Sequence, residues 1–360
     1  MVFRNGNLFK IKTMRDSYGK EREWMKLLPN ENLDICEENF NLFFEIMFER
    51  QEIWYRRFIL KQPAPWTKNE IFRDYKYTNV YRELDRASQW LINNVLTDES
   101  LSVEDLVWKI IIFRFFNQPD TFESNNGFKV NLPNRGRFDK DAMWREVRNV
   151  REIGERNPWH TAYMMNLAFL AMPEDWNEVK QGKFKDYAYT MYAFPKIHAM
   201  IPELVKILKE ANDPDEIVDF LKTLPATAGF QSHEFYIDFC YVAKYWNQPI
   251  MKFNENSWTN VGPGAELGIR LIFPDRKTPQ EKKQAIYDLR YLSNDILRLS
   301  GDFKYIKWNK IKRSYEILNS NASLSLHQIE MWLCEFSKYW KMMIKEGKQR
   351  SRFEPKTKSL

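Results

Sequence analysis

Cysteine is scarce in this sequence, and closely spaced metal ligands are absent from it. The three cysteines, Cys36, Cys240 and Cys334, are far apart and form no C-x-x-C pair. The four histidines are also scattered, and no H-E-x-x-H motif occurs. Zinc and iron–sulfur sites are recognised in a sequence by such spacings. We therefore expect no metal, no cofactor and no disulfide framework, and reduced thiols suit a cytoplasm.

Long apolar runs are absent as well. No uninterrupted apolar span reaches the roughly 20 residues that a transmembrane helix needs. The opening stretch, MVFRNGNLFKIKTMRD, lacks the apolar core of a signal peptide. We expect no membrane contact. The net charge is +6, which favours a polyanionic partner such as nucleic acid without proving one.

Glycine is scarce too, with 12 residues in 360, and alternating strand-like runs are few. Long stretches instead repeat with helical period, which predicts an all-α fold. We expect an N-terminal helical extension over residues 1–60, a main helical domain over 61–345 and a basic disordered tail over 346–360. Residues 1–30 are expected to be irregular. The predicted helices cover residues 39–60, 78–96, 103–116, 141–156, 160–171, 185–193, 195–211, 214–222, 232–246, 265–273, 279–299, 303–318 and 325–345.

An acid-bearing stripe stands out in the stretch LPATAGFQSHEFYIDF and the residues that follow it. Glu234, Asp238 and Tyr241 are spaced so that they share one side of an otherwise apolar helix. A carboxylate that faced an apolar core would be costly to desolvate. The stripe therefore faces either a substrate or an internal cation such as Arg270 or Arg290, and both interpretations stay open.

Two glycine turns flank this helix. Gly229 precedes it, and Gly262 and Gly264 enclose a proline after it. Backbone N–H groups at such a turn, ahead of a helix, form an anion site. The order helix, hairpin, helix is typical of proteins that hold a DNA phosphate in this way. An ordinary glycine turn is the alternative.

A second constellation lies in YKYTNVYRELDRASQWL, where we expect a helix that begins near Asn79. Arg82 and Arg86 are four residues apart and repel each other unless an anion lies nearby. DNA phosphate is one such anion, and a salt-bridged surface helix is the alternative. Arg114, in the most apolar predicted helix, needs a partner, and Asp85 is a candidate.

Several of these motifs together resemble a known family. PAPWTKNEIFRDYKYTNVYRELDR, FRFFNQPDTFE, the LP…GF…E…D helix and VGPGAELGI occur in this order over about residues 60–275. The set resembles the alpha-glutamyl/putrescinyl-thymine pyrophosphorylase family of hypermodified phage DNA, which includes anti-phage glycosylases. The resemblance implies a helix-hairpin-helix DNA-glycosylase-like fold in a bacterial or phage-infected cell. The family's Leu-Pro-Gly-x-Gly hairpin reads Leu-Pro-Ala-Thr-Ala-Gly here, which leaves Gly262 to Gly264 as the better hairpin.

The resemblance implies a monomeric enzyme that flips a bulky modified pyrimidine, such as glucosylated hydroxymethylcytosine, out of double-stranded DNA and excises it. Asp238, or Glu234, is expected to stabilise the oxocarbenium-like sugar. No lysine lies between Lys222 and Lys244, so we expect hydrolysis to an abasic site. The expected base pocket comprises Tyr77, Asn79, Tyr81, Asn117, Trp159, Tyr163 and Tyr241, and the expected DNA contacts are Arg82, Arg86, Gly229, Gly262, Gly264 and Arg270.

Two other functions stay open. One is a transferase that attaches an amino acid or polyamine to 5-pyrophosphomethyl-uracil in DNA and displaces pyrophosphate. Glu234 or Asp238 would then act as base, while Arg82 and Arg86 would stabilise the leaving group. The other is a non-catalytic DNA-binding module, against which the acid stripe argues because carboxylates repel phosphates.

Overall fold

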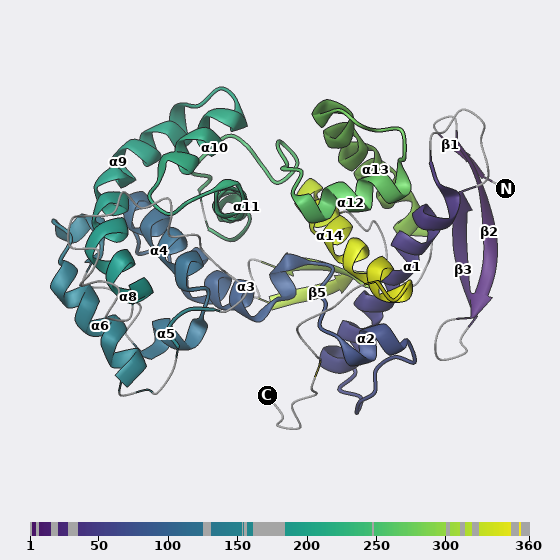
Figure 1. Cartoon of the computed structure of the whole chain (residues 1–360), viewed down its shortest axis with the longest axis horizontal. Helices are drawn as coiled ribbons and strands as arrows, with labels where there is room; N and C mark the ends of the chain where they lie inside the picture. Colours follow the sequence, from purple (N-terminus) through teal and green to yellow (C-terminus); the bar gives the residue numbers. More distant parts are fainter. Residues whose placement is uncertain are drawn as a thin grey trace. The chain divides into compact units, whose positions relative to one another are not determined.

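The computed structural model describes residues 2–4, 7–15, 21–27, 35–124, 131–152, 154, 157–160, 184–246, 248–299, 303–309, 314–318, 324–346 and 353. Most of these residues are helical (Figure 1), so the predicted all-α class is confirmed. The helix expected at 160–171 and most of the expected tail lie outside the described residues. None of the described helices is long and apolar enough to cross a membrane.

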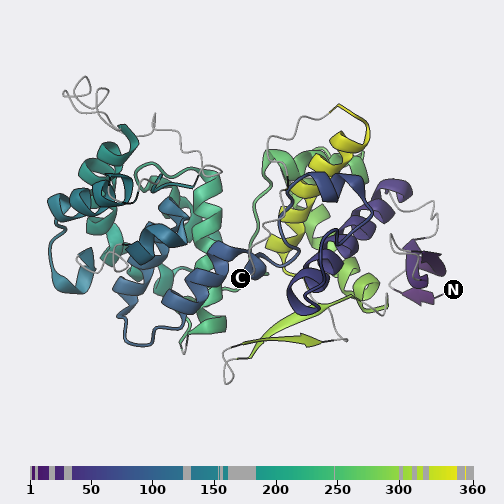
Figure 2. The same ribbon diagram turned by 90° about the horizontal axis from the view of Figure 1, so that it is seen from below.

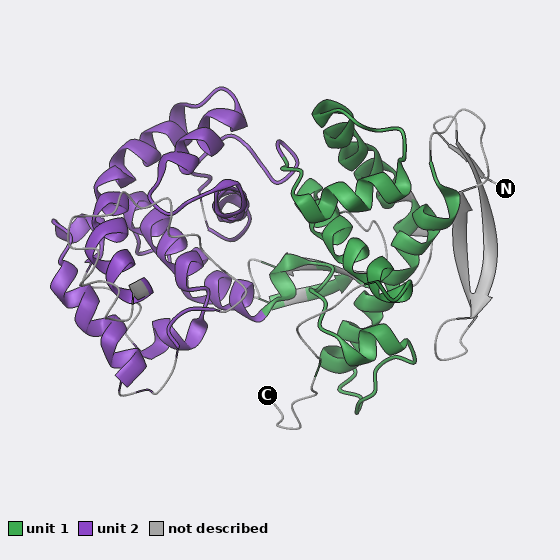
Figure 3. Cartoon of the chain, viewed as in Figure 1, with its two compact units in different colours: residues 1–85, 259–360 green, residues 86–258 purple. Residues whose placement is uncertain are grey.

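The chain divides into two compact units. Unit 1 combines Met1–Asp85 with Thr259–Leu360, and unit 2 is Arg86–Trp258 (Figure 3). These boundaries differ from the expected ones at residues 60 and 345, and the expected domains stay a prediction. Each unit is described by itself below.

Unit 1 is built around long helices from both ends of the chain. Its core contains Phe43 of α1 and Phe336 of α14, whose rings meet edge to face at 5.7 Å. The elements are β1 (Val2–Arg4), β2 (Asn7–Arg15), β3 (Glu21–Leu27), α1 (Glu37–Trp54), α2 (Glu70–Asp74), α12 (Pro263–Ile272), α13 (Pro279–Leu299), β4 (Tyr305–Asn309), β5 (Ser314–Leu318) and α14 (Leu326–Met343).

The strands of unit 1 correct two expectations. Residues 1–30, expected to be irregular, contain a three-stranded antiparallel sheet in the order β1-β2-β3. The helix expected over 303–318 is the hairpin of β4 and β5, in which Trp308 pairs with Tyr315 (Figure 2). The sequence YIKWN is rich in aromatic and β-branched residues, which favour a strand. The apolar spacing in this short stretch fits either period, so periodicity alone does not distinguish them.

Helices α12 and α14 pack with their backbones close together (Figure 2). A Cβ atom at Gly268 would lie 2.5 Å from the backbone oxygen of Leu333, and one at Gly264 would lie 2.9 Å from Cys334 Sγ. Ser337 Oγ donates a 2.6 Å hydrogen bond to the carbonyl oxygen of Gly264. The two glycines therefore allow the close approach of these helices.

Unit 2 is built around α4, the helix that we predicted to be central and buried. Every residue of α4 from Asp105 to Phe116 is buried, which confirms that prediction. The ring of Phe115 lies 5.5 Å from that of Phe194 and 5.6 Å from that of Phe235. The helices are α3 (Arg86–Leu91), α4 (Val103–Phe116), α5 (Pro119–Ser124), α6 (Lys140–Glu152), α8 (Phe184–Ala188), α9 (Phe194–Glu210), α10 (Pro214–Thr223) and α11 (Gly229–Tyr245).

The single helix expected over 78–96 is interrupted. A 3₁₀ turn covers Arg82–Leu84, the backbone of Asp85 is extended, and α3 begins only at Arg86. The Asp85 carboxylate accepts hydrogen bonds from the backbone N–H and side-chain amide of Asn79, at 3.4 and 2.8 Å. Such side-chain bonds to the backbone compete with helix formation, which accounts for the break.

Candidate functional site

A polar network in unit 1 joins α1 to the segment before α3. Arg50 Nη2 donates to Asn79 Oδ1 at 2.5 Å and to the carbonyl oxygen of Tyr77 at 3.3 Å. Asn79 Nδ2 donates to Asp85 Oδ1 at 2.8 Å. The amide of Asn79 is therefore oriented from both sides, with its oxygen toward the cation and its nitrogen toward the carboxylate.

The electrostatics of this network make Asp85 unusual. Burial raises the pKa of its carboxyl to about 6, although Asn79, Arg50 and Arg82 act in the opposite direction. Burial also lowers the pKa of Arg50 to about 10. The Asp85 side chain is only half-buried, so it retains access to solvent. A carboxylate with such a pKa is mostly ionised at neutral pH and accepts a proton more readily than an ordinary aspartate, as a general base must.

The segment around Asn79 is anchored to α14. The backbone N–H of Thr78 donates to Glu335 Oε2 at 3.4 Å, and Gln328 Nε2 donates to Glu83 Oε2 at 3.1 Å. Glu335, Gln328 and Glu83 are all buried. These contacts fix the backbone on either side of Asn79, so the geometry of the network is set by long-range contacts.

Tyr77 and Tyr81, expected as walls of a base pocket, lie in the core of unit 1. The Tyr77 ring meets Phe72 edge to face at 4.9 Å, and the Tyr81 ring lies 6.3 Å from that of Phe303. Burial raises the pKa of the Tyr77 hydroxyl well above its usual range. The two rings stabilise the segment that carries Asn79, and their role as walls stays a prediction.

Arg82 and Arg86 do not share a helix face, which corrects the arrangement expected for them. Arg82 belongs to the 3₁₀ turn and is 4% exposed. Arg86, the first residue of α3, is exposed and pairs with Asp120. The extended backbone at Asp85 places the two arginines on different elements. Whether either contacts DNA stays a prediction.

Asp238 of α11 forms a buried ion pair within unit 2. Arg114 Nε and Nη2 donate to its two carboxylate oxygens at 2.5 and 2.9 Å, and both side chains are almost fully buried. Arg114 also donates to Asn117 Oδ1 at 3.0 Å and Ser88 Oγ at 3.2 Å. The internal cation is thus Arg114, in place of Arg270 or Arg290, and Arg114 is paired with Asp238 where we expected Asp85.

The other expected pocket residues of unit 2 are also deeply placed. Glu234 and Tyr241 are buried. The Trp159 ring stacks on Phe116 at 4.3 Å, and its Nε1 donates to Asp186 at 2.6 Å. Tyr163 lies outside the described residues. The structure brings Asn117 together with Asp238 through Arg114, whereas the catalytic and base-contacting roles stay predictions.

The expected phosphate-binding glycines have different surroundings. Gly229 is exposed at the start of α11, and nothing lies within 4 Å of a Cβ placed there. The N–H of Gly262 donates to Glu330 Oε1 at 3.2 Å, while Gly264 faces Cys334. Arg270, on α12, is exposed. Their expected contacts with DNA stay predictions.

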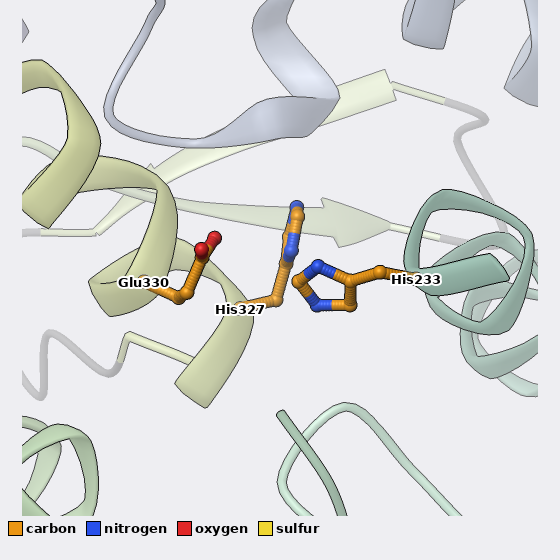
Figure 4. Close-up of side chains that lie close together, drawn as sticks. All are labelled: His233, His327 and Glu330. Carbon is orange, nitrogen blue, oxygen red and sulfur yellow. The ribbon is translucent and has the colours of Figure 1, made fainter. Parts of the chain in front are cut away.

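Three further polar side chains are shown in Figure 4. Glu330 follows His327 by one turn on α14 of unit 1, and both are buried. His233 projects from α11 of unit 2. Within unit 2 its ring lies 5.5 Å from that of Trp258. Sequence reasoning assigned no function to these residues.

Sequence reasoning missed Arg50 and Asp85 as members of one site. Asn79 was predicted, but its two partners come from a helix 29 residues earlier and a loop position 6 residues later. A usable signal was present, because Asp85 lies in a motif that we had already singled out. Sequence reasoning instead made Asp85 a candidate partner of Arg114.

One curated relative is a protein of Bacillus phage SP10 named 5-hmdU DNA kinase. It is 27% identical over 309 residues, which cover 84% of this chain and 45% of that protein. This chain therefore spans less than half the length of that relative. No solved structure gives a significant match.

This comparison overturns the expected hydrolase. A kinase transfers a phosphoryl group, so glycosidic hydrolysis, the glycosylase assignment and a role in anti-phage defence are wrong. The expected transferase alternative is nearer in reaction class, although its amine and pyrophosphate have no counterpart in the name of the relative. The resemblance was correct in its coarser part, a family of enzymes of modified phage DNA, and the finer pyrophosphorylase naming lacks support.

The family itself is established by a match over most of the chain. The family model described as 5-hmdU DNA kinase, helical domain, matches residues 37–349. The match includes α1, the Asn79–Asp85 segment, all of unit 2 and α14. This chain therefore belongs to the family of 5-hmdU DNA kinase helical domains.

Proposed function

We propose that this chain recognises 5-hydroxymethyl-2′-deoxyuridine in DNA and takes part in phosphorylation of its hydroxymethyl group. The observation that carries the proposal is the family match over residues 37–349. The named phage relative supports it, because the substrate in that name is 5-hmdU DNA. The net charge of +6 is compatible with a DNA partner.

The Asn79–Asp85 network offers the chemistry that such a reaction requires. Phosphoryl transfer to a hydroxyl group needs a residue that orients the hydroxyl and accepts its proton, a role that an aspartate fills in protein kinases. Asp85 is partly open to solvent and has a pKa raised to about 6. In this proposal Asp85 accepts the proton of the 5-hydroxymethyl group while the oxygen of that group takes the terminal phosphoryl group of a nucleoside triphosphate, and the diphosphate leaves. Asn79, itself held by Arg50, positions the carboxylate.

A retention experiment tests this function. The immobilised chain is incubated with a mixture of DNA fragments of equal length that contain either thymine or 5-hydroxymethyluracil, and retained DNA is digested and analysed by nucleoside mass spectrometry. We expect enrichment of 5-hydroxymethyl-2′-deoxyuridine over thymidine. Retention of both DNAs in their input ratio, or of neither, would contradict the proposal.

A further inference from the structure

Three consecutive apolar side chains are exposed a few residues after the end of α1. Phe58, Ile59 and Leu60 are 37%, 43% and 47% exposed. A contiguous exposed apolar run is unfavourable in water and in natural proteins marks an interaction site. These three residues belong to unit 1, and we refer to them with Lys61 as the 58–61 tip.

The backbone holds the tip in a defined conformation. A π-helical turn covers Tyr55–Ile59, and the N–H of Leu60 donates to the carbonyl oxygen of Tyr55 at 3.0 Å. Lys61 then adopts a left-handed conformation, with φ of 50°. The helix thus ends abruptly, and the apolar residues lie on its last turn. π-helical turns of this kind are frequent at functional sites.

Cations flank the tip. The Arg57 guanidinium lies 4.8 Å from the centre of the Phe58 ring and 4.9 Å from that of Trp66. Burial lowers the pKa of Arg57, yet an arginine so placed remains charged at neutral pH. Lys61 is exposed. Among the residues that the structure describes, no carboxylate lies within ion-pair distance of Arg57 or Lys61, whereas the neighbouring Arg56 pairs with Glu52 at 3.7 Å.

We propose that the 58–61 tip is a wedge that inserts an apolar side chain between base pairs of duplex DNA while Arg57 and Lys61 contact the adjacent phosphates. Stacked bases offer apolar faces and the backbone offers anions, so duplex DNA matches both halves of the tip. Insertion of Phe, Leu or Ile unstacks a base step, which lowers the cost of exposing a modified base. This inference rests on the proposed recognition of DNA. It adds the element that unstacks the bases of the duplex, the 58–61 tip.

The test uses duplexes that contain 5-hydroxymethyluracil beside 2-aminopurine, whose fluorescence rises on unstacking. We expect the wild-type chain to bind and to raise the fluorescence. The Phe58→Ala/Leu60→Ala variant should bind about tenfold more weakly, because it loses the stacking contact with the bases, and should give no rise in fluorescence. Lys61→Gln should reduce the salt dependence of binding by about one phosphate contact.

Tyr291→Ala is the matched control, because Tyr291 is 54% exposed on α13 of the same unit. It should change neither affinity nor fluorescence, and thermal melts should show that all variants are folded. Equal binding and an undiminished fluorescence rise with Phe58→Ala/Leu60→Ala would overturn the wedge but leave DNA recognition standing, and would favour a protein partner for the tip. Absence of DNA binding by the wild-type chain would overturn both proposals.

Discussion

Two aspartates of this protein hold a negative charge in different ways. Asp238 is fully buried and receives two hydrogen bonds from Arg114. Asp85 is half-buried, accepts hydrogen bonds from the backbone N–H and the side-chain amide of Asn79, and has a raised pKa. The first carboxylate is paired with a buried cation, whereas the second has a pKa raised to about 6 and accepts a proton more readily than an ordinary aspartate. Opposite consequences of substitution follow.

Asp85→Asn should stabilise the protein at neutral pH. The native pKa of about 6 exceeds the usual value of about 3.9, so the native state retains a proton that the unfolded chain releases. Stability therefore falls as pH rises from about 4 to about 6, and this loss is complete above that window. The variant removes the loss and still offers Asn79 an acceptor. Thermal unfolding from pH 4 to 8 should show a variant advantage that grows with pH.

The same substitution should weaken the preference for 5-hydroxymethyluracil over thymine, because the carboxylate is lost. An equal difference in melting temperature at pH 4 and pH 8 would contradict the titration of Asp85. An unchanged preference for 5-hydroxymethyluracil would show that Asp85 takes no part in recognition of the base.

Asp238→Asn should instead destabilise the protein by about 3–5 kcal/mol, because Arg114 would stay buried without a negative partner. Urea unfolding measures this change. Arg114→Met combined with Asp238→Leu should recover much of the loss, since the pair is then replaced by apolar side chains. The control Asp219→Asn breaks an exposed pair with Lys222 at 2.8 Å and should cost less than about 1 kcal/mol. A loss of stability in Asp238→Asn as small as that in Asp219→Asn would show that the buried pair contributes little to stability.

At the scale of the elements, glycine has two separate uses. Gly264 and Gly268 let α12 approach the backbone of α14, whereas Gly229 begins α11 in open space. The motif VGPGAELGI, from which we expected a phosphate contact, thus also contains the glycines that let two helices of unit 1 pack closely. Sequence alone does not distinguish these two uses, because both depend on the absence of a side chain at glycine.

Gly268→Ala should therefore destabilise the protein by about 1–3 kcal/mol, the usual cost of overpacking, because its Cβ would lie 2.5 Å from the Leu333 carbonyl oxygen. Gly229→Ala should be neutral or slightly stabilising, since alanine favours a helix. Chemical denaturation of the two variants checks this contrast. A loss of the same size at both positions would show that helix packing is not its cause.

Elements with an unambiguous period were predictable from the sequence. The helices Val103–Phe116 and Pro279–Leu299 have the bounds that we expected. The hairpin of β4 and β5 and the break at Asp85 were not predictable in this way. The first is too short for its period to be decisive, and the second depends on hydrogen bonds between Asn79 and Asp85. The candidate site was missed because it depends on that break and on Arg50, which lies 29 residues before Asn79.

At the scale of the whole molecule, composition indicated a helical protein with a mild preference for polyanions, and both points agree with its family. The reaction could not be derived from the sequence. A carboxylate beside aromatic residues suits glycosidic hydrolysis as well as proton transfer from a hydroxyl group. Residue types alone therefore did not distinguish a hydrolase from a relative of a kinase.

The central claim, recognition of the 5-hydroxymethyl group in DNA, is tested most directly by a ratio of two dissociation constants. Fluorescence anisotropy gives the Kd for two duplexes of identical sequence, one with thymine and one with 5-hydroxymethyluracil, at one salt concentration. A site built to hydrogen-bond a hydroxyl group rejects the analogue that lacks it. The account predicts that the 5-hydroxymethyluracil duplex binds about tenfold or more tightly. Equal dissociation constants for the two duplexes would contradict it.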